Sequence, residues 1–121
     1  MKFEIQTNVK TSVKQRNTII SIFIENISYI NCVAELSTIH FRDNRQPIVV
    51  SKLLKEFGIE LEKYGFLRVR ANFLVNYICI QKLENTGKTQ LTLINDEIIP
   101  VSRRKYYRIR HIIDNLHDHL L

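Results

Sequence analysis

β-branched and aromatic residues dominate the chain on both sides of a single helical segment, and this placement constrains the fold most. Residues 18–41 carry Ile, Val, Thr, Tyr and Phe in short runs that break near positions 25 and 34. This composition predicts two or three strands. Residues 42–47 (RDNRQP) contain an Asp-Asn pair and a proline, which predicts a turn, and residues 48–50 read as a further strand.

Residues 51–64 change to a helical period. Apolar residues recur there at spacings of four, four and three, with Leu54 beside them: Leu53, Phe57, Leu61 and Tyr64. This pattern predicts a short amphipathic helix, with Ser51 as its N-cap and Gly65 as its stop.

Strand-like residues return after residue 76. Residues 77–83, 89–94 and 97–101 are separated by turn-like residues at 84–88 and 95–96, which predicts two successive hairpins. Residues 102–121 regain helical spacing, with Ser102 as a candidate N-cap and an apolar stripe at Tyr106, Ile109, Ile113, Leu116 and Leu120. Because no strand–helix–strand rhythm appears, we expect a mainly β, antiparallel domain with a C-terminal helix.

The chain is basic and of single-domain size. Eighteen Lys and Arg against twelve Asp and Glu give its 121 residues a net charge of +6. Such a balance favours polyanionic partners, either nucleic acid or an acidic membrane surface. The N-terminus resembles no signal peptide and no apolar run is long enough to span a membrane, so we expect a soluble, cytoplasmic protein.

Cysteine and histidine give no sign of a metal site. Cys32 and Cys79 lie far apart in strand-like runs and form no CxxC motif, so reduced, buried cysteines are expected, with a disulfide as the alternative. His117 and His119 flank Asp118, but two ligands do not close a site. No nucleophile or phosphate-loop motif is present, so neither an enzyme, a cofactor nor a small-molecule substrate is expected.

A run of cations precedes the C-terminal stripe. No acidic residue lies between Glu97 and Asp114, a segment that contains Arg103, Arg104, Lys105, Arg108 and Arg110. Cations at the start of a helix oppose its dipole and repel one another, so an external anion is the natural partner. The tyrosine hydroxyls of Tyr106 and Tyr107 can also reach phosphates. The alternative is a solvated basic face.

Residues 66–76 (FLRVRANFLVN) mix core and polar residues. The apolar residues, with Phe66, Phe73, Leu74 and Val75 among them, are expected to anchor the segment to the core. Arg68 is expected to pair with an acidic neighbour, and Asn76 to cap a turn internally. Arg70 and Asn72 are left to face a partner.

This segment, within KLLKEFGIELEKYGFLRVRANFLVN, resembles a motif of the LytTR DNA-binding domain of bacterial transcription regulators. LIND and IIPVSRRK resemble the later part of the same domain, and FIENISYINC looks like its first pair of strands. The resemblance covers residues 16–110. It implies stacked antiparallel sheets whose loops enter successive major grooves of double-stranded DNA. Residues 1–15 would form an N-terminal extension or extra strand, and residues 111–121 a helical tail.

The resemblance also implies site residues. Arg70 stands where the family usually has a base-contacting His, and an arginine can bond a guanine edge bidentately. Asn95 and Arg103 match other base-contacting positions. The sequence departs from the motif at Ala71, where Arg is common, and at Asn72, where Ser is common. Backbone contacts are expected from Asn72, Ser102, Arg104, Lys105, Tyr106 and Arg108.

Family members commonly act as response regulators on paired direct-repeat promoter sites, so a homodimer on DNA is an expectation. The chain would be either a stand-alone regulator or the C-terminal domain of a longer one. Two other functions stay open: an RNA- or single-strand-binding β module, which needs exposed aromatic residues for base stacking, and a basic protein-interaction domain.

Overall fold

The computed structural model describes the backbone of residues 8–120 and the side chains of residues 8–116. Ten strands and two helices follow one another in this part of the chain, with four single-turn 3₁₀ segments between them. Their order is β1 (Lys10–Gln15), β2 (Thr18–Phe23), η1 (Ile24–Asn26), β3 (Ile27–Val33), β4 (Leu36–Phe41), β5 (Ile48–Val50), α1 (Leu54–Leu61), η2 (Glu62–Tyr64), β6 (Phe66–Arg70), β7 (Phe73–Asn76), η3 (Tyr77–Cys79), β8 (Ile80–Thr86), β9 (Lys88–Leu93), β10 (Ile98–Pro100), η4 (Arg103–Lys105) and α2 (Tyr106–Leu120).

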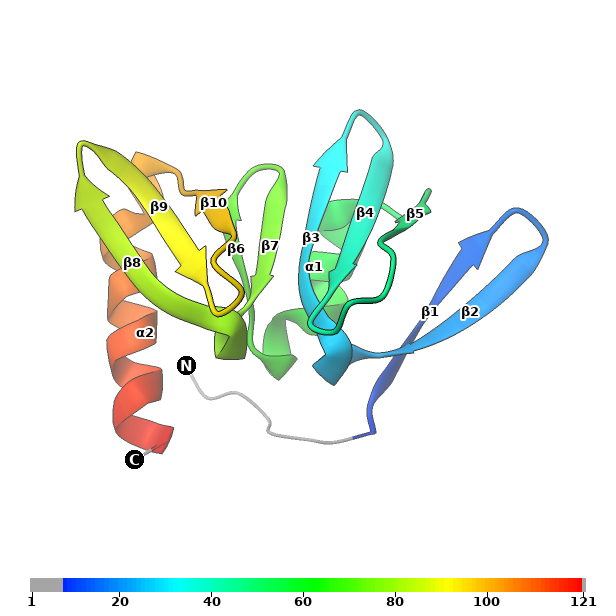
Figure 1. The fold of residues 1–121 in the computed structure, drawn as a ribbon, viewed down its shortest axis with the longest axis horizontal. Coiled ribbons are helices and arrows are strands. Elements are labelled where there is room, and N and C mark those ends of the chain that lie inside the picture. The colour runs from blue at the N-terminus through cyan, green and yellow to red at the C-terminus, as the bar shows by residue number, and fades with distance from the viewer. Residues whose placement is uncertain (1–7, 121) are drawn as a thin grey trace.

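The strands form three antiparallel sheets (Figure 1). The central sheet has five strands in the order β5-β4-β3-β7-β6, a second sheet has the order β10-β9-β8, and β1 pairs with β2 alone. Every strand pair is antiparallel. The prediction of a mainly β fold with stacked antiparallel sheets, one short helix and a C-terminal helix is therefore confirmed.

Other elements cover the central sheet on both faces, and successive residues of its strands point to opposite sides. Ile30 and Leu74 face a core that α1 closes with Phe57 and to which the β1–β2 hairpin contributes. Tyr29 and Val75, the adjacent residues, face a second core formed with the sheet β10-β9-β8 and α2. The molecule is thus layered, with the five-stranded sheet between its two cores.

Helix α1 begins later than the sequence predicts. Its N-cap is Leu53, not Ser51. Its first turn buries Leu54 and Phe57, whereas Leu53 is 47% exposed. The Ser37 hydroxyl of β4 donates to the Lys52 carbonyl at 2.7 Å, and the backbone at Leu53 is still extended. This bond holds residue 52 beside the sheet, and the helix starts only at Leu54. The predicted stop is confirmed, since Gly65 has a left-handed φ of 93°.

The first predicted hairpin also differs in detail. Residues 77–79 form a 3₁₀ turn instead of the start of a strand, because the Asn76 side chain accepts a hydrogen bond from the Ile78 amide at 3.3 Å. Asn76 is buried and donates to the Ile27 carbonyl at 2.9 Å, so its predicted internal capping role is confirmed. The turn between β8 and β9 narrows to Gly87, because Thr86 already pairs with Lys88.

The C-terminal segment enters its helix through the 3₁₀ turn η4. Ser102 occupies the predicted N-cap position, but its side chain makes no capping hydrogen bond. Ile109 and Leu116 are buried, as their spacing predicts. The side chains of His117 and His119 lie outside the described residues. No helix in the described part of the chain is long and apolar enough to cross a membrane. Cys32 and Cys79 are both free, the first half-buried and the second buried.

Four of the hairpin turns point the same way. Figure 1 shows the turns β1–β2, β3–β4, β6–β7 and β8–β9 along its upper side, while the β9–β10 turn lies at the lower side. The segment from β10 to η4 also reaches the upper side. Segments far apart in the sequence therefore lie along one side of the molecule.

Candidate nucleic-acid interface

An open groove of about 730 Å³ lies where the β6–β7 turn, the β8–β9 turn and the segment from β10 to η4 meet. We call it the basic groove. None of the described residues that line it is acidic. Five of them are cations: Arg70, Lys88, Arg103, Arg104 and Lys105. Ala71, Gly87 and Ser102 form part of its wall. The basic groove therefore collects positive charge from three separate segments.

Main-chain hydrogen bonds hold the segment after β10 in place. The Val101 amide donates to the Thr89 carbonyl of β9, and the Ser102 amide donates to the Val69 carbonyl of β6, both at 3.0 Å. Val101 is buried, whereas Arg103 and Arg104 are exposed. The chain thus bridges two sheets immediately before its cations, which fixes the backbone from which those side chains extend.

The β6–β7 turn is fixed in a similar way. The Cys32 amide of β3 donates to the Asn72 carbonyl at 3.0 Å. The Arg68 guanidinium donates through Nε to the Ala71 carbonyl at 3.1 Å, and its Nη2 donates to the same oxygen. The expected pairing of Arg68 with an acidic neighbour is wrong within the described residues, because this side chain bends along its own strand to a carbonyl instead. Arg70 is left exposed beside the turn.

The cations of the basic groove have few partners of their own. Arg103 donates to the Gly87 carbonyl at 3.3 Å, and the Lys105 ammonium donates to the Arg68 carbonyl at 3.4 Å. None of the five forms an ion pair with a residue that the structure describes. Burial, together with the charges of Arg68, Arg108 and Arg104, lowers the pKa of Lys105. The positive charge here is uncompensated, which suits an anion such as a phosphate.

The other residues expected at the DNA backbone surround this centre. Asn72 is half-buried in the β6–β7 turn, and Ser102 is half-buried in the groove wall. Tyr106 is half-buried and packs edge-on against Tyr107, with ring centroids 5.0 Å apart. Arg108 is exposed one turn further along α2 and does not line the basic groove.

Asn95 lies apart from the other expected base-contacting residues. It occupies the β9–β10 turn, where its side chain donates to the Glu97 carboxylate at 2.9 Å and accepts from the Glu97 amide at 3.2 Å. At about 3.3 Å per strand residue, the five steps from Lys88 to Leu93 along β9 place this turn roughly 17 Å from Lys88. The structure brings Arg70 and Arg103 together but leaves Asn95 near the opposite end of the sheet.

Lys88 is the one cation of the basic groove that the sequence does not identify as a candidate. Residues 84–88 read as a turn, and a lysine in a turn is ordinary. Its position follows from pairing: Lys88 faces Thr86 across the turn, and β10 pairs with β9 so that Pro100 faces Gln90. This strand pairing places Lys88 in the same groove as residues 102–105. No local signal in the sequence predicts the pairing.

Comparison with known proteins agrees with this architecture. A sequence comparison with curated proteins gives no significant match. Among solved structures, the chain is similar to the LytTr DNA-binding domain of a Bacillus cereus protein described as a methyl-accepting/DNA response regulator. That match has a TM-score of 0.68 at 20% identity and covers 86% of this chain and 94% of the other. A family model for the LytTr DNA-binding domain matches residues 17–114, and the chain therefore belongs to the LytTr DNA-binding domain family.

Proposed function

We propose that the protein recognises specific sites in double-stranded DNA and regulates bacterial transcription, with its turns inserted into major grooves. The observation that carries this proposal is the convergence of five cations from three segments on one groove that no acidic residue lines within the described part of the chain. Backbone phosphates supply the charge that such a surface lacks, and base edges supply specificity. Turns from neighbouring sheets that project along one side of the molecule are suited to reach a groove of DNA (Figure 1).

Arg70 and Arg103 are the proposed base-reading residues. Both are exposed, both line the basic groove, and each comes from a different segment. An arginine can donate two hydrogen bonds to guanine O6 and N7, which discriminates that base from the others. The surrounding residues are proposed to contact phosphates. These are the residues expected from the sequence, namely Asn72, Ser102, Arg104, Lys105, Tyr106 and Arg108, and in addition Lys88.

A base contact by Asn95 is a separate hypothesis. Its hydrogen bonds to Glu97 are those of a turn residue, and its distance from the basic groove requires a second point of contact with DNA. Replacing Asn95 with Ala tests the hypothesis directly. A retained site preference would leave Asn95 with a turn role alone.

Neither alternative binding function has comparable support. A single-strand module needs exposed aromatic side chains on which bases stack. Among the described residues, Tyr107 is the one aromatic side chain that is largely exposed, at 73%. A basic protein-interaction domain would use the same cations, and DNA sequence preference distinguishes it from a regulator.

We propose that the target is a pair of direct repeats in a promoter, as for a response regulator. Two copies of the chain would bind it, one on each repeat. The basic groove occupies one edge of the domain, so one copy contacts a limited length of duplex. A second copy on a neighbouring site doubles the contacts and raises the affinity through effective concentration.

Selection from a pool of random duplex DNA at near-physiological salt tests the proposal, with the wild type and Arg70→Ala in parallel. We expect the wild type to enrich a motif and the variant to lose preference at one position. Arg45→Ala is the matched control, because Arg45 is an exposed arginine paired with Asp43 in the β4–β5 connection. If the wild type enriches no motif and its binding only fades with salt, the proposed regulator function is wrong.

A further inference from the structure

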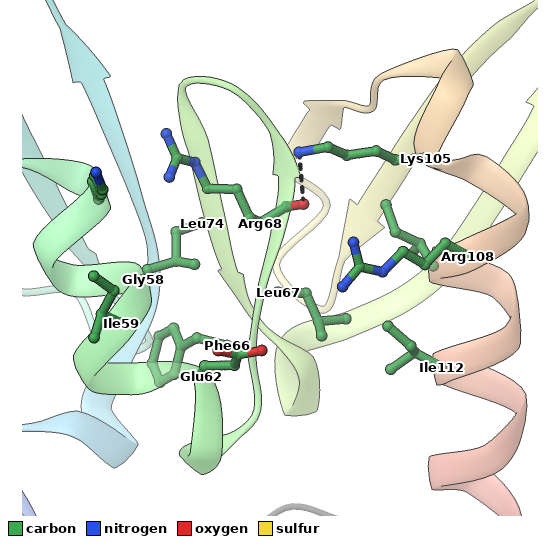
Figure 2. A pocket seen from close by; sticks show the side chains of 12 residues that line it. Gly58, Ile59, Glu62, Phe66, Leu67, Arg68, Leu74, Lys105, Arg108 and Ile112 are labelled. Atoms are coloured by element: carbon green, nitrogen blue, oxygen red, sulfur yellow. Dashed lines mark hydrogen bonds between the residues drawn. The ribbon is translucent and has the colours of Figure 1, made fainter. Parts of the chain in front are cut away.

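A second groove, of about 250 Å³, lies between α1 and α2 and crosses β6 (Figure 2). We call it the inter-helix groove. Buried apolar side chains form its floor, among them Phe66, Leu67, Leu74 and Ile109. Ile59 of α1 lines one wall and is 72% exposed, although it is a large aliphatic residue. The inter-helix groove therefore offers apolar surface that the fold leaves uncovered.

Cations surround this apolar surface. Lys55, Arg68, Lys105 and Arg108 line the groove against one acidic residue, Glu62. None of the four cations forms an ion pair within the described residues. Arg68 and Lys105 instead donate to main-chain carbonyls. Their mutual repulsion contributes to the lowered pKa of Lys105. A bound anion would relieve this repulsion.

We propose that the inter-helix groove binds a small amphiphilic anion, namely a compact aromatic or medium-chain carboxylate. Its apolar body would lie on Phe66 and Leu67, and its carboxylate would accept hydrogen bonds from the arginine and lysine side chains at the rim. The volume is just below the usual range for ligand pockets, about 300–1,000 Å³, so the ligand must be compact. An inorganic phosphate would leave the apolar floor uncovered.

The inter-helix groove is joined to the basic groove through two residues. Lys105 lines both grooves. Arg68 lines the inter-helix groove, and its guanidinium holds the Ala71 carbonyl in the β6–β7 turn. A carboxylate bound to Lys105 competes with DNA for that charge, and a carboxylate bound to Arg68 acts on the side chain that holds the β6–β7 turn. Because coupling is reciprocal, the carboxylate weakens DNA binding and DNA weakens carboxylate binding. This coupling rests on the proposed function, whereas carboxylate binding does not.

Gly58 offers a way to fill the inter-helix groove without substituting a residue that lines the basic groove. It lines the inter-helix groove from α1, and an added Cβ would meet only Arg68 Nη1, at 3.9 Å. Gly58→Leu therefore places a large side chain in the groove, and Gly58→Ala is its matched control. Lys55→Glu reverses one exposed charge at the rim and leaves the groove open.

The test uses the full chain without DNA and the fluorescent anion 1-anilinonaphthalene-8-sulfonate, displaced by octanoate. We expect saturable binding by the wild type and by Gly58→Ala, at least tenfold weaker binding by Gly58→Leu, and three- to tenfold weaker binding, roughly, by Lys55→Glu. Circular dichroism checks that each variant is folded. Octanol, which lacks the charge, should displace the probe far less well than octanoate.

Three results would overturn the proposal. Undiminished probe binding by both Gly58→Leu and Lys55→Glu would place the probe elsewhere. Equal displacement by octanol would show an apolar surface without anion recognition. Displacement by an acidic peptide as effective as by octanoate would assign the groove to a protein segment. In a second arm, octanoate should lower the DNA affinity of the wild type but not of Gly58→Leu; an unchanged wild-type affinity would refute the coupling alone.

Discussion

Arg103 and Arg104 are neighbours with different proposed roles, so single substitutions can separate base reading from charge. Arg103→Ala should cost about 1–3 kcal/mol at the selected site and relax preference at one base. Arg104→Ala should weaken binding to all duplexes alike and reduce the salt slope by about 0.9. Fluorescence anisotropy with matched and mismatched duplexes, at several salt concentrations, measures both quantities. Equal losses on both duplexes for Arg103→Ala would assign it to a phosphate instead.

Asn76 is a purely structural polar residue and should affect stability more than DNA contact. It is buried, and its side chain joins β7 to the Ile27 carbonyl and the Ile78 amide. Asn76→Ala removes the side-chain partner of the carbonyl of buried Ile27 and the cap of the Ile78 amide, which should lower the free energy of unfolding by about 1–3 kcal/mol. Urea denaturation measures this loss. Asn44→Ala, at an exposed loop position, is the control and should change stability by less than about 0.5 kcal/mol.

His40 should make the stability of the fold depend on pH. Burial lowers the pKa of His40 below its usual 6.5, and the charge of Glu97 opposes this only in part. The ring stacks on Tyr29 at 4.1 Å and is hydrogen-bonded to Asn31. In the unfolded chain His40 binds a proton near pH 6.5, whereas in the folded chain it binds the proton only at a lower pH.

The contribution of His40 is therefore complete above about pH 6.5 and is lost as the pH falls towards its lowered pKa, by at most about 1.4 kcal/mol per pH unit. Denaturation of the wild type and His40→Gln across pH 4.5–8 gives the difference. A parallel pH dependence in the two proteins would show that His40 is not responsible.

At the scale of elements, the two glycines around α1 should respond in opposite directions to alanine. Gly58 lies inside the helix with room for a Cβ, so Gly58→Ala should stabilise the protein by up to about 1 kcal/mol. Gly65 ends the helical segment with φ of 93°, so Gly65→Ala should destabilise it by about 1–2 kcal/mol. Thermal melts of the two variants measure both changes. The same sign for both would contradict this account of the two glycines.

The sequence predicts which elements exist better than where they begin. Period and composition identify α1, the two hairpins around β9 and the C-terminal helix, because these signals are local. The start of α1 is missed because a hydrogen bond from Ser37, fifteen residues away, holds Lys52 beside the sheet. The start of β8 is missed because Asn76 caps a 3₁₀ turn there. Both errors arise from side-chain bonds that periodicity does not contain.

At the scale of the whole molecule, the salt dependence of DNA binding should count the phosphate contacts. Four cations are proposed at phosphates: Lys88, Arg104, Lys105 and Arg108. The logarithm of the binding constant should therefore fall against the logarithm of salt concentration with a slope of about −4. Titrations between 50 and 300 mM salt, roughly, measure this slope for the selected duplex. A slope near −1 would mean that most of the cations in the basic groove do not contact the backbone.

The candidate site is only partly predictable from the sequence. Arg70 and Arg103 stand out because they lie in motifs that resemble known ones. Lys88 does not stand out, because its place beside Ser102 depends on how β8, β9 and β10 pair. The separation of Asn95 from the basic groove follows from the same pairing. Contacts between distant segments are set by strand register, which a single sequence does not state.

The main-chain bonds that hold Val101 and Ser102 between two sheets have a consequence for how such domains diversify. Peptide groups make these bonds, so the frame that carries Arg103 does not depend on the side chains displayed around the basic groove. Arg70 is likewise exposed beside a turn whose main chain is tied to β3. A substitution at either position alters what is displayed and leaves the frame intact. During evolution, a lineage can therefore acquire a new target site one residue at a time, without passing through an unfolded intermediate.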